Sequence, residues 1–262
     1  MRHVLAAINA DPCARPVLDA ASALAELFDA TTVALHVRET GVGSPTELTD
    51  VAGVELRGVG GEPIEQIVAA ADEGEIAAVV LGSRGAQAGP RPAGHTALEV
   101  IKRVAKPVTI VPPHARTPKR FARLLVPLEG AKESSEAVDD TIALAHRHKL
   151  EIVVLHVHSP STMPAFSDHE PHGTQAWDQE FLARHLAATH EHVRLLRHFG
   201  VAADDVVAVA EEAAADLIVL AWSQMLGEGR AHVVSETIAH SSLPILLLPV
   251  RVGPRRPARA TR

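Results

Sequence analysis

The segment TVALHV, residues 32–37, reappears as IVVLHV, residues 152–157, 120 residues further along the chain. At the same spacing RHVLAAINAD matches ARLLVPLEGA, and PVLDAASALAELF matches EAVDDTIALAHRH. Later blocks match at wider spacings, with Gly61 against Gly200 and KPVTIVPP against LPILLLPV. Long blocks that match in the same order indicate an internal duplication. We therefore expect two copies of one unit, the second enlarged between its second and third strands.

Each copy alternates short apolar runs with helical patterns, which predicts βαβ units and a parallel sheet. The runs are apolar almost throughout, as is typical of strands that helices cover on both faces. In the first copy the expected strands are residues 4–8, 32–37, 54–59, 77–81 and 108–111, and the expected helices are residues 17–28, 64–72 and 96–104. In the second copy the expected strands are residues 124–128, 152–157, 193–198, 217–220 and 245–248, with an added helix over residues 177–190.

The composition sets the domain boundaries. The stretch PPHARTPKRF is rich in proline and basic residues, so residues 114–120 are expected to link a first domain, 1–113, to a second, 121–250. The tail RVGPRRPARATR, residues 251–262, is arginine-rich and is expected to be disordered.

The net charge and the amino-acid composition argue against nucleic acid and membranes as partners. The net charge is −7 and aromatic residues make up 3% of the chain, which disfavours nucleic acid as a partner. No apolar run approaches the ~20 residues that a membrane helix needs, so no membrane contact is expected. The single cysteine, Cys13, suits a reducing compartment, and we expect a cytoplasmic protein.

One strand end carries the residue types that bind phosphate. In open parallel sheets, ligands lie beyond the carboxyl ends of the strands. There the sequence LGSRG supplies Gly82 and Gly85, and His95-Thr96 then opens a helix. Glycines let backbone N–H groups approach phosphates, and a helix N-terminus adds its free donors and its dipole. Thr96 is placed to cap this helix or to donate its hydroxyl to a phosphate.

With these residues the sequence resembles the universal stress protein family in its tandem two-domain form. The resemblance covers residues 2–250 and includes VLGSRG, GGEP, LHV and PVTIVP. It implies an α/β fold of two tandem Rossmann-like (adenine nucleotide alpha hydrolase-like) domains. Each would be a five-stranded parallel sheet of order 3-2-1-4-5 flanked by helices, and the two would pair through their last strands as an intramolecular pseudo-dimer. A homodimer of whole chains is a further possibility.

ATP-binding members of that family carry Gly-x-x-Gly, then nine residues, then Gly-Ser/Thr. Carried over, the resemblance implies an adenine nucleotide, ATP with Mg²⁺ as its companion, in the first copy only. The implied site residues are Ile8, Asn9, Val37, Gly82, Arg84, Gly85, Gly94, His95 and Thr96. Two departures are evident: Asn9 stands where the family usually has Asp, and His95 stands at the third glycine, with Gly94 beside it.

The second copy departs further from the motif. It has Ala221-Trp222-Ser223-Gln224 in place of the glycine segment and Val233 in place of the threonine. We expect Trp222 and Met225 to fill the vacated cleft and to leave this copy as a pairing partner without a ligand.

The chain has 16 histidines, which are dense between residues 146 and 198. Such a tract can hold Zn²⁺ or Ni²⁺, but a solvated helix is the favoured interpretation and no metal site is predicted. The tract includes His169, His172, His185, His190 and His192. His36 and His156 are expected at the sheet edge near the cleft rather than as ligands.

No catalytic motif accompanies the nucleotide motif, so at most very slow ATP hydrolysis is expected. The leading hypothesis is a stress-linked regulator that binds an adenine nucleotide and presents a surface to an unidentified protein partner. Two alternatives remain at this point: an interaction module of the same fold that binds no nucleotide, and an adenine-nucleotide hydrolase or transferase.

Overall fold

The computed structural model describes residues 1–9, 14–38, 54–83, 93–115, 117–158, 173–186, 193–224 and 230–250. In the first copy the elements are β1 (His3–Ile8), α1 (Ala14–Leu27), β2 (Thr31–Arg38), β3 (Glu55–Gly60), α2 (Pro63–Asp72), β4 (Ile76–Gly82), α3 (His95–Arg103) and β5 (Val108–Val111). In the second copy they are β6 (Arg123–Pro127), α4 (Lys132–Arg147), β7 (Glu151–His158), α5 (Gly173–His185), β8 (Val193–Phe199), α6 (Ala202–Glu212), β9 (Leu217–Trp222), α7 (Arg230–His240) and β10 (Ile245–Pro249).

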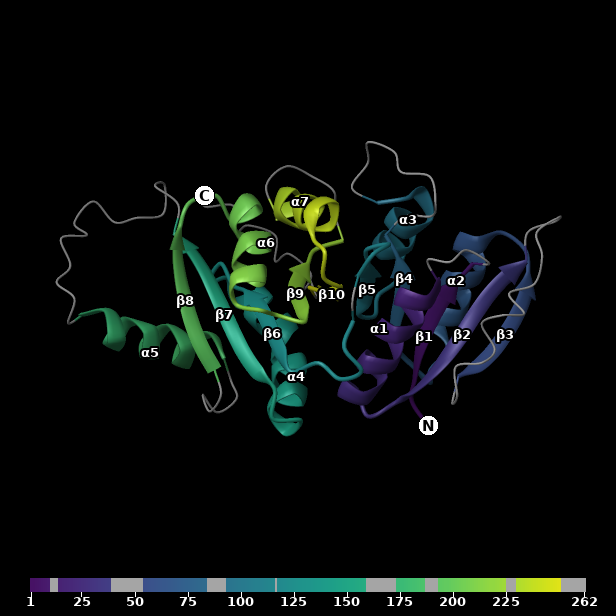
Figure 1. Ribbon diagram of the computed structural model, residues 1–262, viewed down its shortest axis with the longest axis horizontal. Coiled ribbons are helices and arrows are strands. Elements are labelled where there is room, and N and C mark those ends of the chain that lie inside the picture. The colour runs from purple at the N-terminus through teal and green to yellow at the C-terminus, as the bar shows by residue number, and fades with distance from the viewer. Residues whose placement is uncertain are drawn as a thin grey trace, which may run out of the picture.

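All ten strands form one sheet, in the order β3-β2-β1-β4-β5-β10-β9-β6-β7-β8 (Figure 1). Within each copy the neighbouring strands are parallel. The two copies meet where β5 pairs with β10 in the antiparallel sense, with Ile110 opposite Ile245 and Thr109 opposite Leu246. The last strands of the copies therefore join them into a single ten-stranded sheet.

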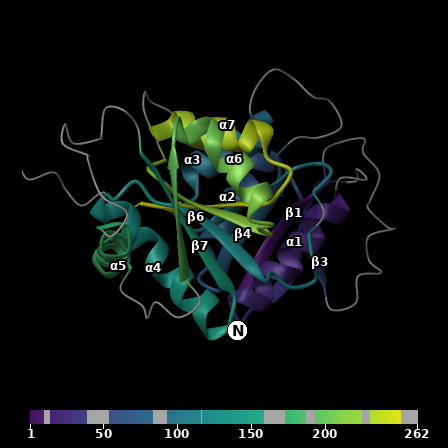
Figure 2. The ribbon, with the colours of Figure 1, turned by 60° about the vertical axis from the view of Figure 1, so that its left-hand side comes forward.

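Helices cover both faces of this sheet. The hydrophobic cluster on one face takes its helical residues from α1, α4 and α5, and the cluster on the other face takes them from α2, α3, α6 and α7. Figure 2 shows α6 and α7 on one side of the strands and α4 and α5 on the other. The α/β layering expected from the sequence is thus confirmed.

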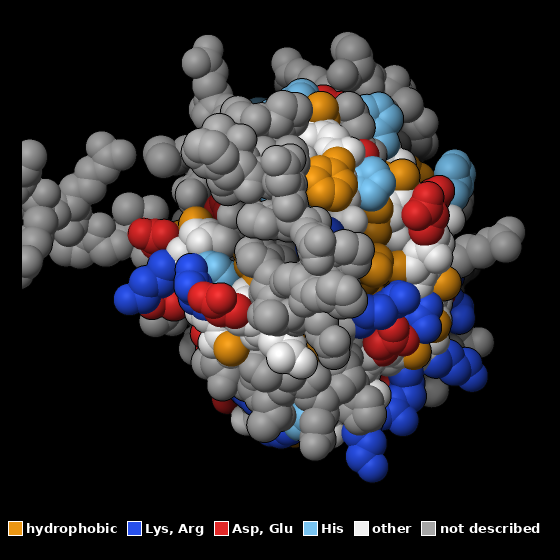
Figure 3. All heavy atoms as spheres, turned by 90° about the vertical axis from the view of Figure 1, so that its left-hand side faces the viewer, with side chains coloured by type: hydrophobic (Ala, Val, Ile, Leu, Met, Phe, Trp, Pro, Cys, Tyr) orange, Lys and Arg blue, Asp and Glu red, His pale blue; other side chains and the backbone are white. Residues whose placement is uncertain are grey.

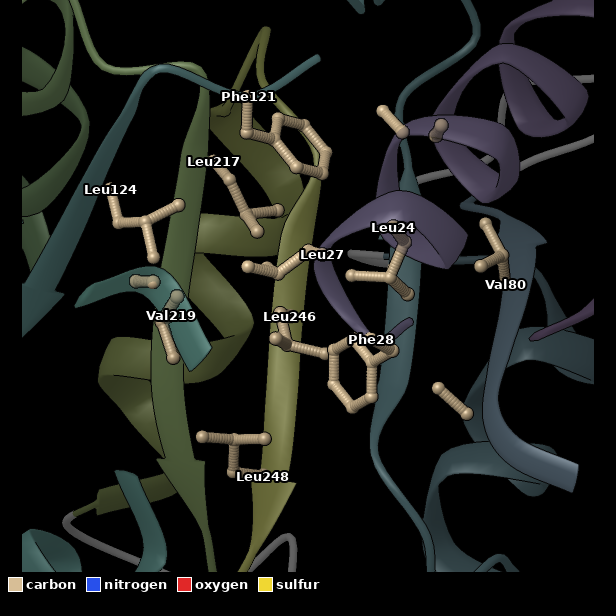
Figure 4. Packing of buried hydrophobic residues seen from close by; sticks show 14 of the residues in the cluster. Leu24, Leu27, Phe28, Val80, Phe121, Leu124, Leu217, Val219, Leu246 and Leu248 are labelled. Atoms are coloured by element: carbon tan, nitrogen blue, oxygen red, sulfur yellow. The ribbon is translucent and has the colours of Figure 1, made fainter. Parts of the chain in front are cut away.

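Small aliphatic side chains fill the core, as the scarcity of aromatic residues predicts. Helix α1 buries five alanines together with leucines, and alanine and leucine are both strong helix formers. Leu27 at its end and Phe28, which follows it, lie beside Leu246 of β10 at the junction of the copies (Figure 4). Each fully buried leucine contributes about 2 kcal/mol relative to an exposed one, so this packing supports the junction from the face of α1.

The GGEP segment is explained by the local backbone. Gly61 has a φ of 136°, a conformation that favours glycine, and Pro63 occupies the first turn of α2, where its missing N–H costs nothing. The segment thus ends β3 and starts α2 within three residues.

The added helix of the second copy differs from its predicted bounds. It begins at Gly173 rather than at residue 177, because a first helical turn needs no apolar side chain and the apolar period starts later. It ends at His185 rather than at residue 190, with the Leu186 N–H still donating to the Leu182 carbonyl. The segment 187–192 and the tail 251–262 lie outside the described residues. Within the described part of the chain, every helix is too short or too polar to cross a bilayer.

Candidate functional site

The ends of three adjacent parallel strands bring the predicted site residues to one edge of the sheet. Strand β1 lies between β2 and β4, with Ile8 opposite His36 and Ala7 opposite Leu81. Asn9 directly follows β1 and is exposed, Val37 is half-buried near the end of β2, and Gly82 ends β4. These three residues, which come from distant parts of the sequence, therefore lie at the same carboxyl edge.

A pair of backbone hydrogen bonds holds the segment that follows β4. The Ser83 N–H donates to the Val111 carbonyl at 2.8 Å, and the Ser83 carbonyl accepts from the Gly94 N–H at 2.6 Å. Ser83 is buried. The role of Ser83 is not predictable from the sequence, because the link joins residues far apart in the chain and has no local pattern. Its effect is to hold Gly94 next to the end of β4.

Helix α3 begins beside this link. Gly94 is its N-cap and, as a glycine, has no side chain to cap the helix; no side-chain cap hydrogen bond is present among the described residues. The first intrahelical bond runs from the Leu98 N–H to the Gly94 carbonyl, so the N–H groups of the first turn have no acceptor within the helix. Thr96 is half-buried and His95 is exposed at this end. The arrangement suits an anion.

Ile8, an implied site residue, has its side chain in the core, and its carbonyl accepts a hydrogen bond from a neighbouring strand. Its side chain is buried in the cluster on the α1 face, and its carbonyl accepts a hydrogen bond from Nδ1 of His36 at 3.2 Å. His36 is 4% exposed, so it is a buried residue that ties the ends of β1 and β2, whereas an edge position was predicted. The second copy repeats the contact between Nδ1 of His156 and the Leu128 carbonyl at 2.8 Å.

The described residues fit a nucleotide in part. Asn9, Val37, Gly82, Gly94, His95 and Thr96 lie at the edge just described. Gly82 and Gly94 carry no side chain that would block a phosphate, and the uncapped start of α3 supplies donors. Arg84 and Gly85 lie outside the described residues, as does Cys13.

The equivalent edge of the second copy holds a cavity of about 110 Å³. Its lining is Pro127, Leu128, Glu129, Ser134, Leu155, Val157, Ala202, Val206, Leu220, Ala221, Val233 and Val234. The prediction that Trp222 fills this cleft is therefore wrong. Met225, the other residue expected there, lies outside the described residues.

Trp222 instead contacts the first copy. Its side chain is 3% exposed, and Nε1 donates to the Ile101 carbonyl at 3.2 Å. Nε2 of Gln224 donates to the Val104 carbonyl at 2.7 Å. The last carbonyls of a helix have no intrahelical partner, so the end of α3 is an acceptor site for these donors. The pairing of β5 with β10 places α3 within their reach.

Histidine and phenylalanine rings pack together between β7, β8 and α5. The ring centroids of His156 and His158 are 4.5 Å apart, and those of His156 and Phe181 are 4.7 Å apart. His185 lies 4.6 Å from Phe181, and His158 stacks on Phe199 at 5.3 Å. Histidine and hydrophobic side chains are interspersed on this end of the molecule (Figure 3).

Burial lowers the pKa of both His158 and His185, and the neighbouring His156 lowers each further. Arg197 acts in the same direction on the pKa of His158, and Arg184 on that of His185. No set of three metal-ligating side chains converges within the described residues. His169, His172, His190 and His192 lie outside them.

The fold and this edge define a class: a tandem, Rossmann-like α/β protein with its candidate ligand site at the carboxyl ends of the strands. The chain belongs to the universal stress protein family, whose model matches residues 46–112 and 120–249.

Solved structures agree on the fold. A universal stress protein from Archaeoglobus fulgidus DSM 4304 aligns with a TM-score of 0.67 at 15% identity, over 94% of this chain and 98% of that one. A protein of unknown function from Pseudomonas aeruginosa PAO1 aligns with a TM-score of 0.69 at 14% identity, over 95% and 93%. No curated protein matches the chain.

Proposed function

We propose that the protein is a stress-linked regulator whose first copy binds an adenine nucleotide, ATP in the leading case. The observation that carries the proposal is the uncapped start of α3, held beside Gly82 by the hydrogen bond between Gly94 and Ser83. Backbone N–H groups at a helix N-terminus, next to a residue without a side chain, suit the phosphates of a nucleotide.

Each site residue has a role in this proposal. Exposed Asn9 offers its amide to the adenine or ribose edge, where it can both donate and accept. Val37 packs against the base, and Ile8 contributes backbone only because its side chain is buried on the α1 face. The Thr96 hydroxyl and the Gly94 and His95 backbone serve the phosphates, with Arg84 and Gly85 added by the motif. Mg²⁺ would be bound through the phosphates, whose charge it neutralises.

The proposed activity is binding and release rather than turnover. The nine site residues include no carboxylate to orient a water and no lysine to neutralise a γ-phosphate. Occupancy of the first copy would then be the signal that a protein partner reads. The chain acts as a pseudo-dimer through β5 and β10, and any assembly of whole chains adds to this pairing.

One observation favours a second candidate, an interaction module that binds no nucleotide. His95 stands at the position of the third glycine and is exposed at the start of α3, where its imidazole competes for space with a phosphate.

Calorimetric titration of the purified chain with Mg·ATP distinguishes the two candidates. We expect binding in the micromolar range for the wild type. Thr96→Val, which copies the residue of the second copy, should weaken it about tenfold because one hydroxyl donor is lost, a difference of ~1.4 kcal/mol. The matched control, Val233→Thr in the second copy, should leave the titration unchanged. An absence of heat at millimolar ATP, with no nucleotide detected by mass spectrometry of the purified protein, favours the interaction module.

A further inference from the structure

The cavity of the second copy occupies the place that the candidate nucleotide site has in the first. Glu129 corresponds to Asn9, Val157 to Val37, Ala221 to Gly82 and Val233 to Thr96 along the repeat. The second copy has therefore kept a hollow at its strand ends while changing the residues that would touch a ligand.

The changes make the lining apolar. All lining residues except Glu129 and Ser134 are aliphatic or proline. Val233 has replaced the hydroxyl that the first copy offers to phosphate, and Ala221 adds a methyl group where Gly82 has none. A hollow with such walls favours an apolar group and penalises an unpaired polar one.

Glu129 supplies a carboxylate to the lining of the cavity. Glu129 is exposed, and its Oε1 accepts a hydrogen bond from Oγ of Ser134 at 2.7 Å. Ser134 is buried in the first turn of α4 and itself lines the cavity, so its hydroxyl fixes the position of the Glu129 carboxylate. Gly130, with a φ of 87°, makes the turn from Glu129 into α4. An anion at this point repels phosphate and attracts a cation.

We propose that this cavity binds a small organic amine, with the apolar group inside and the ammonium group at Glu129. The volume of about 110 Å³ is below the roughly 150 Å³ of an engineered cavity that holds benzene, so the cavity suits a short branched chain or most of one small ring. The inference is independent of nucleotide binding in the first copy, because it rests on residues of the second copy alone.

Three probes of nearly equal shape test the charge preference: benzylamine, benzyl alcohol and benzoate. Ligand-observed NMR titrations of the full chain at pH 7 should give a dissociation constant of about 1 mM for benzylamine. Benzyl alcohol should bind about threefold more weakly, because a solvent-exposed ion pair adds little affinity. Benzoate should bind most weakly of the three. Two results would overturn the proposal. One is tighter binding of benzoate than of benzylamine. The other is a dissociation constant for benzylamine more than about 20-fold above the expected value of about 1 mM.

Variants locate the site. Glu129→Gln should bring benzylamine down to the affinity of benzyl alcohol without changing that of benzyl alcohol, whereas Asn9→Asp, at the matching position of the first copy, should change neither. Ala221→Leu fills the cavity and should abolish binding of all three probes. Half-buried Ala202→Leu, at the start of α6, provides a second plug if the first variant fails to fold. Binding that survives a folded plug variant would contradict the assignment.

Discussion

At the scale of single residues, Trp222 is the most informative side chain. The sequence predicts that it lies in a loop beside a ligand cleft of the second copy. In the structure its indole N–H instead donates to the Ile101 carbonyl, near the end of α3 in the first copy. Gln224 donates to the same helix end two residues later. Both side chains satisfy carbonyls that a short helix leaves without partners, so a position expected to mark a lost ligand site instead joins the copies.

Trp222→Phe keeps much of the apolar contact and removes the indole donor. We expect the free energy of unfolding to fall by about 2 kcal/mol, because the Ile101 carbonyl loses a buried partner and the smaller ring leaves a void. Urea denaturation followed by circular dichroism measures the change. Phe199→Leu is the control, because Phe199 is 65% exposed, and it should change the free energy by less than about 0.5 kcal/mol. An unchanged midpoint for Trp222→Phe would show that the hydrogen bond contributes nothing.

At the scale of elements, α5 rests on a histidine-rich surface. Phe181, Leu182 and Leu186 bury their side chains, and Phe181 lies between the rings of His156 and His185. Around this contact, Arg184 pairs with Glu180 and Arg197 pairs with Asp178. The docking of α5 thus depends on packing against imidazole rings.

Acid should loosen α5. The folded state lowers the pKa of His158 and His185, so below the ordinary histidine pKa of about 6.5 the unfolded chain binds more protons than the folded chain. Stability is therefore complete above that pH and is lost as the pH falls through it. Hydrogen-exchange protection factors for the amides of α5 should decrease between pH 7.5 and 5.5, measured by mass spectrometry.

The double variant His158→Phe/His185→Phe should flatten this pH dependence, since it removes both titrating rings from the contact. His240→Gln is the matched control, because His240 is an exposed histidine on α7 outside the cluster. Protection of α5 that rises on acidification in the wild type would refute the assignment.

At the scale of the whole molecule, the antiparallel pairing of β5 with β10 joins the two copies in one sheet, and we expect them to unfold together. Thr109 lies at this junction with 0% exposure, opposite Leu246, and its hydroxyl has no hydrogen-bond partner among the described residues. A buried hydroxyl without a partner costs free energy relative to a methyl group of the same shape.

Thr109→Val should therefore stabilise the whole chain by about 1 kcal/mol and leave a single cooperative transition. Differential scanning calorimetry checks both points. Thr237→Val is the matched control, since that threonine is equally buried but its hydroxyl donates to the Val233 carbonyl at 2.7 Å. It should give no gain. Two separated transitions, or a loss of stability in Thr109→Val, would contradict this view of the junction.

The sequence predicts much of the fold because its signals are local and repeated. Apolar runs and the duplication suffice to predict parallel strands with helices on both faces, whereas the junction through the last strands is implied by the family resemblance. For the candidate site, the sequence predicts that Asn9, Val37 and Gly82 share the carboxyl edge of the sheet, because each follows or ends a predicted parallel strand. The link between Ser83 and Gly94, the orientation of Trp222 and the hollow at Glu129 could not be predicted, because each depends on contacts between residues far apart in the chain.

Helix α3 connects the candidate site of the first copy to the second copy. It is nine residues long, about 13 Å. It starts at the candidate nucleotide edge of the first copy and ends where Trp222 donates to it. The residue before Trp222, Ala221, lines the cavity of the second copy. A single helix therefore joins its first turn to the carbonyls that Trp222 and Gln224 hold. Should ligands occupy both edges, any effect of the first on the affinity for the second must be matched by an equal effect in return. Helix α3 is the structural connection through which such an effect would pass.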